Sequence, residues 1–337
     1  MSMRRLKVGT IGLRAGHPRQ WEGSSLVETH GVCDTDEALL RTVARECGAK
    51  VASTDYRDLV NCPEIDIIFV ASPDQWHCEQ ACAALRAGKH VLCEKPMVMT
   101  LEECDLLVRT ADETGGKFLV GQVCRFAPGF AMAKRLIAEG LIGDLFFLES
   151  EYAHDYTHIK GVGGWRVDPV RLRHPFLGGA CHAVDLLRWI GGDVAEVFAY
   201  ANRKVLTDWP VDDCTIAAMK FARGGVLGKV FCGIGVKRPY TMRSVFYGTK
   251  GTIIADNTSP EIQVASEKAF GHQRFASVPV DIASHNKRAE MDALARAILD
   301  DTEVELDERE GARTVATCLA AVQSAATGKP VAVRNQW

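Results

Sequence analysis

The sequence lacks the features that would place it in a membrane or on a nucleic acid. No apolar run approaches the ~20 residues that a membrane-spanning helix needs. Residues 1–7 lead directly into an apolar segment, without the hydrophobic core of a signal peptide. A formal net charge of −3 offers no basic face for phosphates or anionic lipids. We therefore expect a cytoplasmic protein with no membrane or nucleic-acid partner.

The sequence also lacks a cysteine pattern typical of a metal site or a disulfide framework. None of its twelve cysteines forms a CxxC pair. Cys78 and Cys82 are four residues apart on a predicted helix, but no histidine or further cysteine stands at metal-site spacing. Others, such as Cys33 and Cys93, lie in apolar, strand-like segments. We predict reduced, mostly buried thiols and no metal.

The first part of the chain alternates strand and helix. A chain of 337 residues is long enough for two domains. The near-continuous apolar run at 65–71 is typical of a parallel strand covered on both faces. Further predicted strands end near 11, 33, 93 and 121, and predicted helices lie at 35–47, 78–88 and 101–114. This alternation predicts a Rossmann domain, a doubly wound parallel sheet, over residues 1–124.

After residue 124, predicted strands follow one another with few helices between them. Alternating segments at 146–152, 194–201, 215–221, 226–232 and 243–247 predict a mostly antiparallel, open-faced sheet. Predicted helices at 128–140, 182–190, 286–299 and 311–327 would cover one side of it. We assign residues 125–337 to this second, α+β domain.

A partial dinucleotide fingerprint follows the first strand. Gly12 can make the tight turn, but Arg14 and His17 stand where the second and third glycines would be. Asp34 lies 22 residues after Gly12, close to the spacing of the acid that binds an adenosine ribose. Asp34 can also begin the helix that follows it, and both roles are compatible.

A second signal is Glu94-Lys95-Pro96, directly after the predicted strand 90–93. A strand that delivers a carboxylate and an ammonium to its carboxyl end places charge where open α/β sheets bind ligands. The alternative is a surface Glu–Lys pair at a strand exit. The triplet alone favours this alternative, so the surrounding motifs must decide.

Five segments in order resemble the Gfo/Idh/MocA family, NAD(P)-dependent oxidoreductases that include glucose–fructose oxidoreductase and inositol dehydrogenases. They are Ala71-Ser72-Pro73 with His77, then AGKHVLCEKP at 87–96, VGQ at 120–122 with Arg125-Phe126, IGDL at 142–145, and HAVDLLRW at 182–189. The resemblance covers most of the chain.

The resemblance implies roles for matching residues. Lys95 and His182 would be the catalytic proton-transfer pair, either one acting as base. Residues implied to bind the cofactor are Gly12, Arg14, Asp34, Ser72, Pro73, His77, Glu94, Lys95, Gln122 and Arg125. NAD is expected rather than NADP, because Asp34 would repel a 2′-phosphate and Thr35-Asp36 supply no arginine to receive one.

The sequence departs from the family pattern at Gly178, where the common motif has a carboxylate four residues before the histidine. Polar residues upstream could replace it, and Asp155 or His154 is the predicted partner that orients His182. The predicted substrate-binding residues are His154, Asp155, Trp165, Arg166 and His174, with Tyr156 and His158 nearby. An aromatic beside donors suits a sugar, although the stretch can equally be an ordinary loop.

We therefore expect an NAD-dependent dehydrogenase of a sugar, inositol or related polyol. One alternative is a binding protein that holds NAD but has lost turnover, which the missing carboxylate would permit. Another is a glycoside-cleaving enzyme that uses NAD for transient oxidation. We also expect a homodimer or homotetramer joined through the open face of the second sheet.

Overall fold

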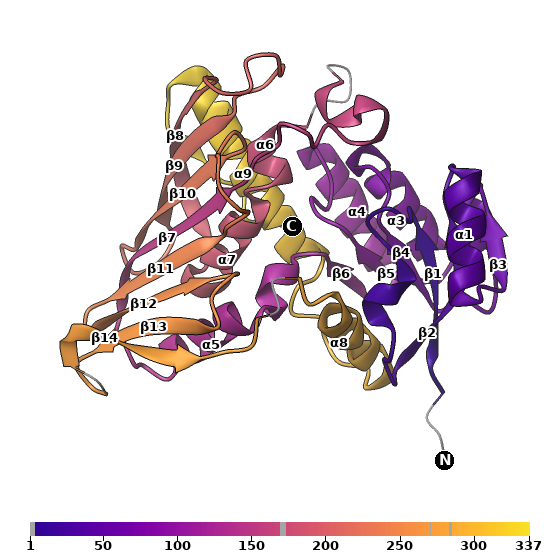
Figure 1. The fold of residues 1–337 in the computed structure, drawn as a ribbon, viewed down its shortest axis with the longest axis horizontal. Helices are drawn as coiled ribbons and strands as arrows, with labels where there is room; N and C mark the ends of the chain where they lie inside the picture. The colour runs from indigo at the N-terminus through magenta and orange to yellow at the C-terminus, as the bar shows by residue number, and fades with distance from the viewer. Residues whose placement is uncertain (1–3, 169–172, 270, 283–284) are drawn as a thin grey trace. The chain divides into compact units, whose positions relative to one another are not determined.

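A computed structural model describes residues 4–168, 173–269, 271–282 and 285–337. The chain divides into two compact units, which are described separately. Unit 1 contains the residues up to 122 and 287–312, and unit 2 contains 123–286 and 313–336. Figure 1 labels the elements of both units.

Unit 1 is built on a parallel sheet with strand order β3-β2-β1-β4-β5-β6 in its described residues. The strands are β1 (Leu6–Ile11), β2 (Val27–Cys33), β3 (Val51–Ser53), β4 (Ile67–Val70), β5 (His90–Cys93) and β6 (Phe118–Val120). The helices between them are α1 (Glu37–Cys47), α2 (Tyr56–Val60), α3 (His77–Arg86) and α4 (Leu101–Thr114). This order reverses direction beside β1, which places a ligand-binding edge at the carboxyl ends of β1 and β4.

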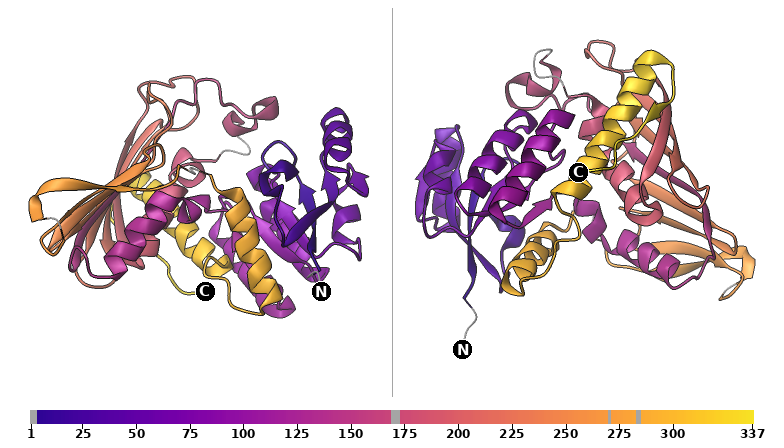
Figure 2. Two further views of the ribbon diagram at one scale, coloured as in Figure 1. Left: turned by 60° about the horizontal axis from the view of Figure 1, so that its bottom comes forward. Right: turned by 180° about the vertical axis from the view of Figure 1, so that it is seen from behind.

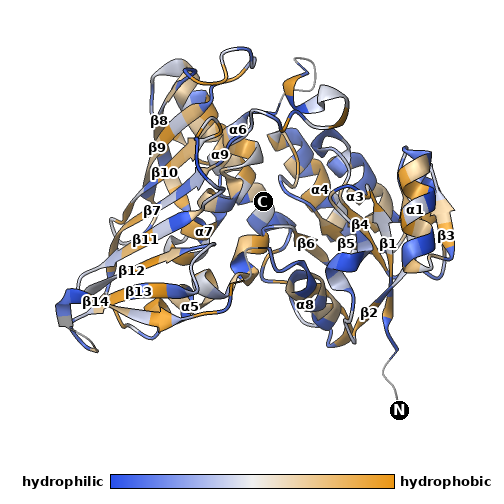
Figure 3. Ribbon diagram, in the orientation of Figure 1, coloured by the Kyte–Doolittle hydropathy of each residue, from blue (hydrophilic) through white to orange (hydrophobic). Residues whose placement is uncertain are grey.

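Local sequence sets where these helices begin. Thr100 and Glu103 form a complete capping box at the start of α4. Asp36, rather than Asp34 or Thr35, caps α1 by accepting from the backbone N–H groups of Ala38 and Leu39. Figure 3 shows both polar and apolar residues on α3 and α4. The apolar side of α4, including Leu107 and Val108, is buried.

Helix α8 (Lys287–Leu299) belongs to unit 1, and this differs from the predicted domain division at 124/125. It packs against β2, β5 and the short helix η1 (Pro18–Trp21), so that Met291 and Leu294 are fully buried. The chain thus returns to the first unit before its last strand, β15 (Val331–Ala332), joins the second sheet. A domain boundary predicted only from the change in the pattern of strands and helices near residue 122 does not reveal that the chain re-enters unit 1.

Unit 2 is built on one large sheet with strand order β14-β13-β12-β11-β7-β10-β9-β8-β15 in its described residues. Only the pairing of β10 with β7 is parallel among the described strand pairs of this sheet. Its strands are β7 (Leu145–Ala153), β8 (Val194–Asn202), β9 (Cys214–Phe221), β10 (Leu227–Gly233), β11 (Arg243–Gly248), β12 (Gly251–Asp256), β13 (Glu261–Ser266), β14 (Gly271–Pro279) and β15 (Val331–Ala332).

Helices α5 (Pro128–Ala138) and α7 (Cys181–Gly191) and the C-terminal part of α9 (Glu308–Thr327) cover one face of this sheet, as Figures 1 and 2 show. The predicted fold class, a Rossmann sheet followed by an open-faced, mostly antiparallel sheet, is confirmed. Among the described residues, no helix is both long and apolar enough to cross a membrane.

Candidate active site

The turn after β1 is shaped by two glycines. Gly12 has φ +91°, and a Cβ there would lie 2.5 Å from the backbone of Ala71 and Ser72 at the end of β4. Gly16 packs equally closely, because its Cβ would lie 2.7 Å from the side chain of Ala71. Gly16, not His17, therefore provides the close approach expected of the third fingerprint glycine.

Asp34 lies beside this turn. Its Oδ2 accepts from the backbone N–H of Leu13 (2.8 Å), and its Oδ1 accepts from that of Asp36 (2.9 Å). Each oxygen keeps a lone pair with which to bind a hydroxyl. Arg14 reaches the same edge and pairs with Asp36 at 2.8 Å. An arginine thus reaches this edge, and the carboxylate of Asp36 already neutralises it.

His77 is predicted to line the cofactor, and in the structure both of its ring nitrogens face backbone carbonyl groups. Its side chain is buried, and its ring nitrogens lie 2.9 Å from the carbonyl oxygens of Pro96 and Ser72. Ser72 also donates its hydroxyl to Gln80 (2.7 Å), and Pro73 directly precedes the short helix η2 (Asp74–Trp76). His77 therefore ties together the turns after β4 and β5.

The carboxyl end of β5 presents the Glu94-Lys95-Pro96 triplet, with a cis peptide before Pro96. Glu94 is largely buried. Its Oε2 accepts from the backbone N–H of Lys95 (3.1 Å), and its Oε1 accepts from the ammonium of Lys287 (2.5 Å). Burial favours the neutral acid, but the positive charges of Lys287 and Lys95 outweigh it and lower the pKa of Glu94. The carboxylate is therefore ionised and fixed at both oxygens.

Gln122 follows β6 at the same edge of the sheet. It is 2% exposed, and its Oε1 has no hydrogen-bond partner within the described ranges. A buried amide oxygen without a partner costs free energy unless a ligand or water supplies a donor. Gln122 is thus a candidate for direct contact with a bound amide or hydroxyl.

In unit 2, His182 is buried in the first turn of α7. It is joined to His154 by a series of neighbouring rings. The ring centroids of His182 and His285 are 6.4 Å apart, those of His285 and Tyr240 are 5.9 Å apart, and those of Tyr240 and His154 are 4.9 Å apart. Buried Tyr152 and Tyr156 extend this cluster and share a hydrogen bond of 2.8 Å between their hydroxyls. The sequence interpretation missed Tyr152, Tyr240 and His285.

Trp165 and Arg166 lie in η4 (Val162–Val167), as part of the predicted substrate loop. Two guanidinium groups flank the Trp165 ring, because Arg166 and Arg173 each lie 5.2 Å from its centroid. Arg166 also lies 5.7 Å from the ring of Tyr156. The loop residues thus join the aromatic cluster, with Arg173 as a member that the sequence interpretation did not identify.

Two predicted substrate-binding residues, Asp155 and His174, have hydrogen-bond partners within the protein. The Asp155 carboxylate accepts from Thr157 and from the ammonium of Lys237 (2.9 Å), and these bonds hold the pKa of Asp155 below its usual range. His174 accepts from the backbone N–H of Phe176 (3.1 Å) and caps α6 (Pro175–Gly178). Burial lowers the pKa of His174 to about 4, so its ring is neutral.

Arg125 is predicted to close the nicotinamide end of the site, and in the structure it forms an ion pair with Asp185. Its Nε and Nη2 both donate to the carboxylate of Asp185 at 2.7 Å, and both side chains are buried in unit 2. Such a bidentate pair is a rigid link between the short helix η3 (Val123–Phe126) and α7. Arg125 therefore supports the helix that carries His182.

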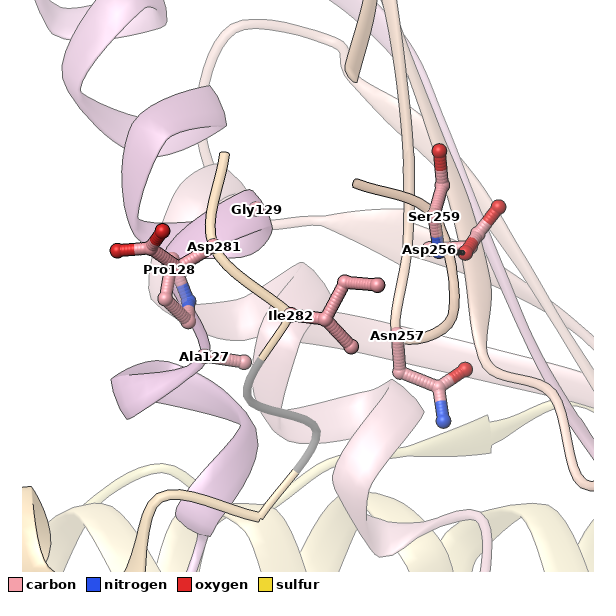
Figure 4. A pocket seen from close by; sticks show the side chains of 8 residues that line it. All are labelled: Ala127, Pro128, Gly129, Asp256, Asn257, Ser259, Asp281 and Ile282. Carbon is pink, nitrogen blue, oxygen red and sulfur yellow. Dashed lines mark hydrogen bonds between the residues drawn. The ribbon is translucent and has the colours of Figure 1, made fainter. Parts of the chain in front are cut away.

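Two further features lie outside the predicted site. Figure 4 shows a small pocket where the start of α5 meets residues 256–259 and 281–282, and none of the predicted site residues lines it. His30, Cys62 and Glu64 bring possible metal-ligating atoms within 4.8 Å of one another. The ammonium of Lys7 lies 3.0 Å from Glu64 and already balances its charge, so we assign no metal there.

Comparison with known proteins places the chain in a family. Residues 6–122 match the oxidoreductase family with an NAD-binding Rossmann fold, and residues 130–254 match the GFO/IDH/MocA C-terminal domain. The chain is 30% identical over 299 residues to 1,5-anhydro-D-fructose reductase of Ensifer adhaerens, covering 87% of each chain. The chain belongs to the Gfo/Idh/MocA family of oxidoreductases.

Other members of the Gfo/Idh/MocA family agree with this assignment. Inositol 2-dehydrogenase 2 of Saccharopolyspora erythraea is 32% identical over 256 residues, which are 74% of this chain and 72% of that one. The fold also matches levoglucosan dehydrogenase in complex with NADH and levoglucosan, with a TM-score of 0.88, 25% identity and coverage of 98% and 99% of the two chains. The predicted family, reaction class and NAD cofactor are confirmed.

The residues of unit 1 fit NAD. The Asp34 oxygens are oriented by backbone donors at the edge where an adenosine ribose would bind. The unpartnered Oε1 of Gln122 can accept a hydrogen bond from a carboxamide. Glu94 and Lys95 stand at the end of β5, at the same edge of the sheet as Gln122.

Proposed function

We propose that this protein oxidises a secondary alcohol of a sugar, inositol or related polyol with NAD, using Lys95 and His182 to move the hydroxyl proton. The observation that carries the proposal is the cluster of imidazole, phenol and guanidinium groups in unit 2, to which His182 is joined through His285. Such groups match the hydroxyls and apolar ring faces of a polyol. The names of relatives, an anhydrofructose reductase and an inositol dehydrogenase, point to the same substrate class.

The bound nicotinamide would supply the hydride acceptor. This chain must then take the proton that the alcohol loses as the hydride departs. Lys95 directly follows β5, and its ammonium can donate a hydrogen bond to the substrate oxygen. His182 lies in the first turn of α7, where the positive end of the helix dipole disfavours the imidazolium. A neutral ring is therefore available as the base, and His154, through Tyr240 and His285, is the proposed orienting group.

We also propose a homo-oligomer formed through the uncovered face of the second sheet. Phe146, Tyr200, Ile216 and Leu227 expose apolar side chains on β7, β8, β9 and β10. The helices of unit 2 cover the other face, so this one must be solvated or paired. A monomeric mass by light scattering at micromolar concentration would contradict the proposal.

A panel of polyols and sugars tests the activity directly. The purified protein is mixed with NAD and each compound, and formation of reduced nicotinamide is followed by absorbance. Oxidation of at least one polyol supports the proposal. Release of an aglycone from a glycoside without net NADH formation would favour the glycoside-cleaving alternative. NADH binding without turnover of any compound would favour the binding-protein alternative.

A further inference from the structure

A buried charge cluster stands behind Glu94. The ammonium of Lys287, at the start of α8, lies 2.5 Å from Oε1 of Glu94 and 3.2 Å from Oε2 of Glu290. The side chains of Glu94 and Lys287 are each 12% exposed, and that of Glu290 is fully buried. All three residues belong to unit 1, although 193 positions separate Glu94 from Lys287 in the chain.

Within this cluster, neighbouring groups hold both side chains of the Glu94–Lys287 ion pair in place. Glu290 holds the ammonium of Lys287 from within α8, and the backbone N–H of Lys95 holds the second oxygen of Glu94. Burial raises the pKa of Glu290 to about 7, while the negative charges of Glu290 and Glu94 outweigh burial and raise the pKa of Lys287. Lys287 therefore keeps its charge in the folded protein.

Stability alone does not account for this arrangement. Burying an ion pair costs desolvation of both charges, and an apolar pair of similar volume is often as stable. The carboxylate that the pair immobilises is the one at the carboxyl edge of β5, where the fold binds ligands. Gly121 lies beside it, and a Cβ there would be 3.3 Å from Oε2 of Glu94, so the glycine keeps a side chain away from this oxygen.

We propose that Lys287 is a positioning residue for the cofactor, which holds the Glu94 carboxylate ionised and correctly oriented to accept a hydrogen bond from the nicotinamide-side ribose. The inference rests on the proposed function. It makes α8, which follows strand β14 of the second sheet in the chain, a part of the dinucleotide site. Lys287 acts through Glu94 and does not itself touch the cofactor.

A double-mutant cycle measures this coupling. The dissociation constant of NADH is determined by fluorescence titration of the wild type, Lys287→Met, Glu94→Gln and the double variant, without substrate. We expect Lys287→Met to weaken NADH binding about 10-fold, equivalent to about 1.4 kcal/mol. In the Glu94→Gln background the same change should have little further effect, because the carboxylate that Lys287 positions is already gone.

Three controls separate positioning from folding. Thermal unfolding is measured for every variant, because breaking a buried pair also destabilises the protein. Lys287→Arg retains the charge and should bind NADH within about 3-fold of the wild type, whereas Arg288→Met, an exposed neighbour on α8, should bind like the wild type. The double variant has no unpaired buried charge at this pair, so it should recover part of the stability lost in Lys287→Met.

The outcomes are distinct. Loss of affinity that disappears in the Glu94→Gln background supports the inference. Unchanged NADH affinity in Lys287→Met, or an equal loss in both backgrounds, overturns it. A wild type that binds NADH but oxidises no polyol would overturn the proposed function, and the cycle would still decide the role of Lys287. A wild type that does not bind NADH overturns both.

Discussion

Arg173 fills the space that a side chain on residue 178 would need. A Cβ built on Gly178 would lie 2.0 Å from Nε and 2.3 Å from Cζ of the buried Arg173. The common family motif has a carboxylate at this position, and here a guanidinium occupies the adjoining space instead. The space beside Gly178 is therefore taken by Arg173, five residues earlier in the chain.

Restoring the family carboxylate should destabilise this protein. We expect Gly178→Asp to cost about 1–3 kcal/mol of unfolding free energy, because Arg173 must move out of a packed position. The double variant Arg173→Ala/Gly178→Asp should be more stable than the sum of the two single changes predicts. Urea denaturation of all four proteins measures this. Additive costs would show that Arg173 does not occupy the space in solution.

Cofactor selectivity should depend on Asp36. It neutralises Arg14 at the adenosine edge, beside Asp34. Asp36→Asn keeps a side chain that can cap α1 but releases Arg14 to meet a 2′-phosphate. We expect the ratio of kcat/KM for NADP to that for NAD to rise about 10-fold, a 1.4 kcal/mol change.

The matched control is the double variant Arg14→Ala/Asp36→Asn. It also lacks the Asp36 charge but has no guanidinium to bind the phosphate, so most of the gain should disappear. A wild type that uses NADP as efficiently as NAD would contradict this account of the adenosine edge.

His174 should make stability depend on pH. Its native ring stays neutral down to about pH 4, whereas in the unfolded chain it takes up a proton near its ordinary value of about 6.5. The unfolded state therefore binds more protons between these values, and stability falls as pH decreases through this window. His174→Asn keeps the cap of α6 without the titration.

Between about pH 7 and about pH 4.5 the wild type should lose about 2 kcal/mol more unfolding free energy than His174→Asn. Urea denaturation of both proteins at the two pH values measures the difference. Equal losses would show that His174 is not buried as a neutral ring.

The parts predictable from sequence are those with local signals. The alternation of strand and helix predicted the Rossmann sheet, and the predicted helix at 101–114 coincides with α4, which begins at the capping box of Thr100 and Glu103. Helix α2 and strand β3 are five and three residues long, too short for a periodic pattern to reveal them. Strands β12, β13 and β14 were also missed, although β13 (EIQVAS) alternates polar and apolar residues over its first four positions.

The residues of the candidate active site were likewise predictable only where a local motif marks them. The motif at 94–96 identified Glu94 and Lys95, but the partners that position such groups are distant in the chain. Lys287 reaches Glu94 across 193 positions, and Arg125 reaches Asp185 across 60. Short spacing reveals caps and turns, whereas contacts of this length depend on the packing of whole elements.

The catalytic rate of Lys95 and His182 variants on an oxidised polyol tests the central claim most directly. Lys95→Met and His182→Ala should each lower kcat by about 10²-fold or more, a usual size for acid–base groups. His182→Ala should bind NADH like the wild type, because His182 is assigned to the substrate. If His182→Ala turns the substrate over at the wild-type rate, another group is the base and the proposed mechanism is wrong.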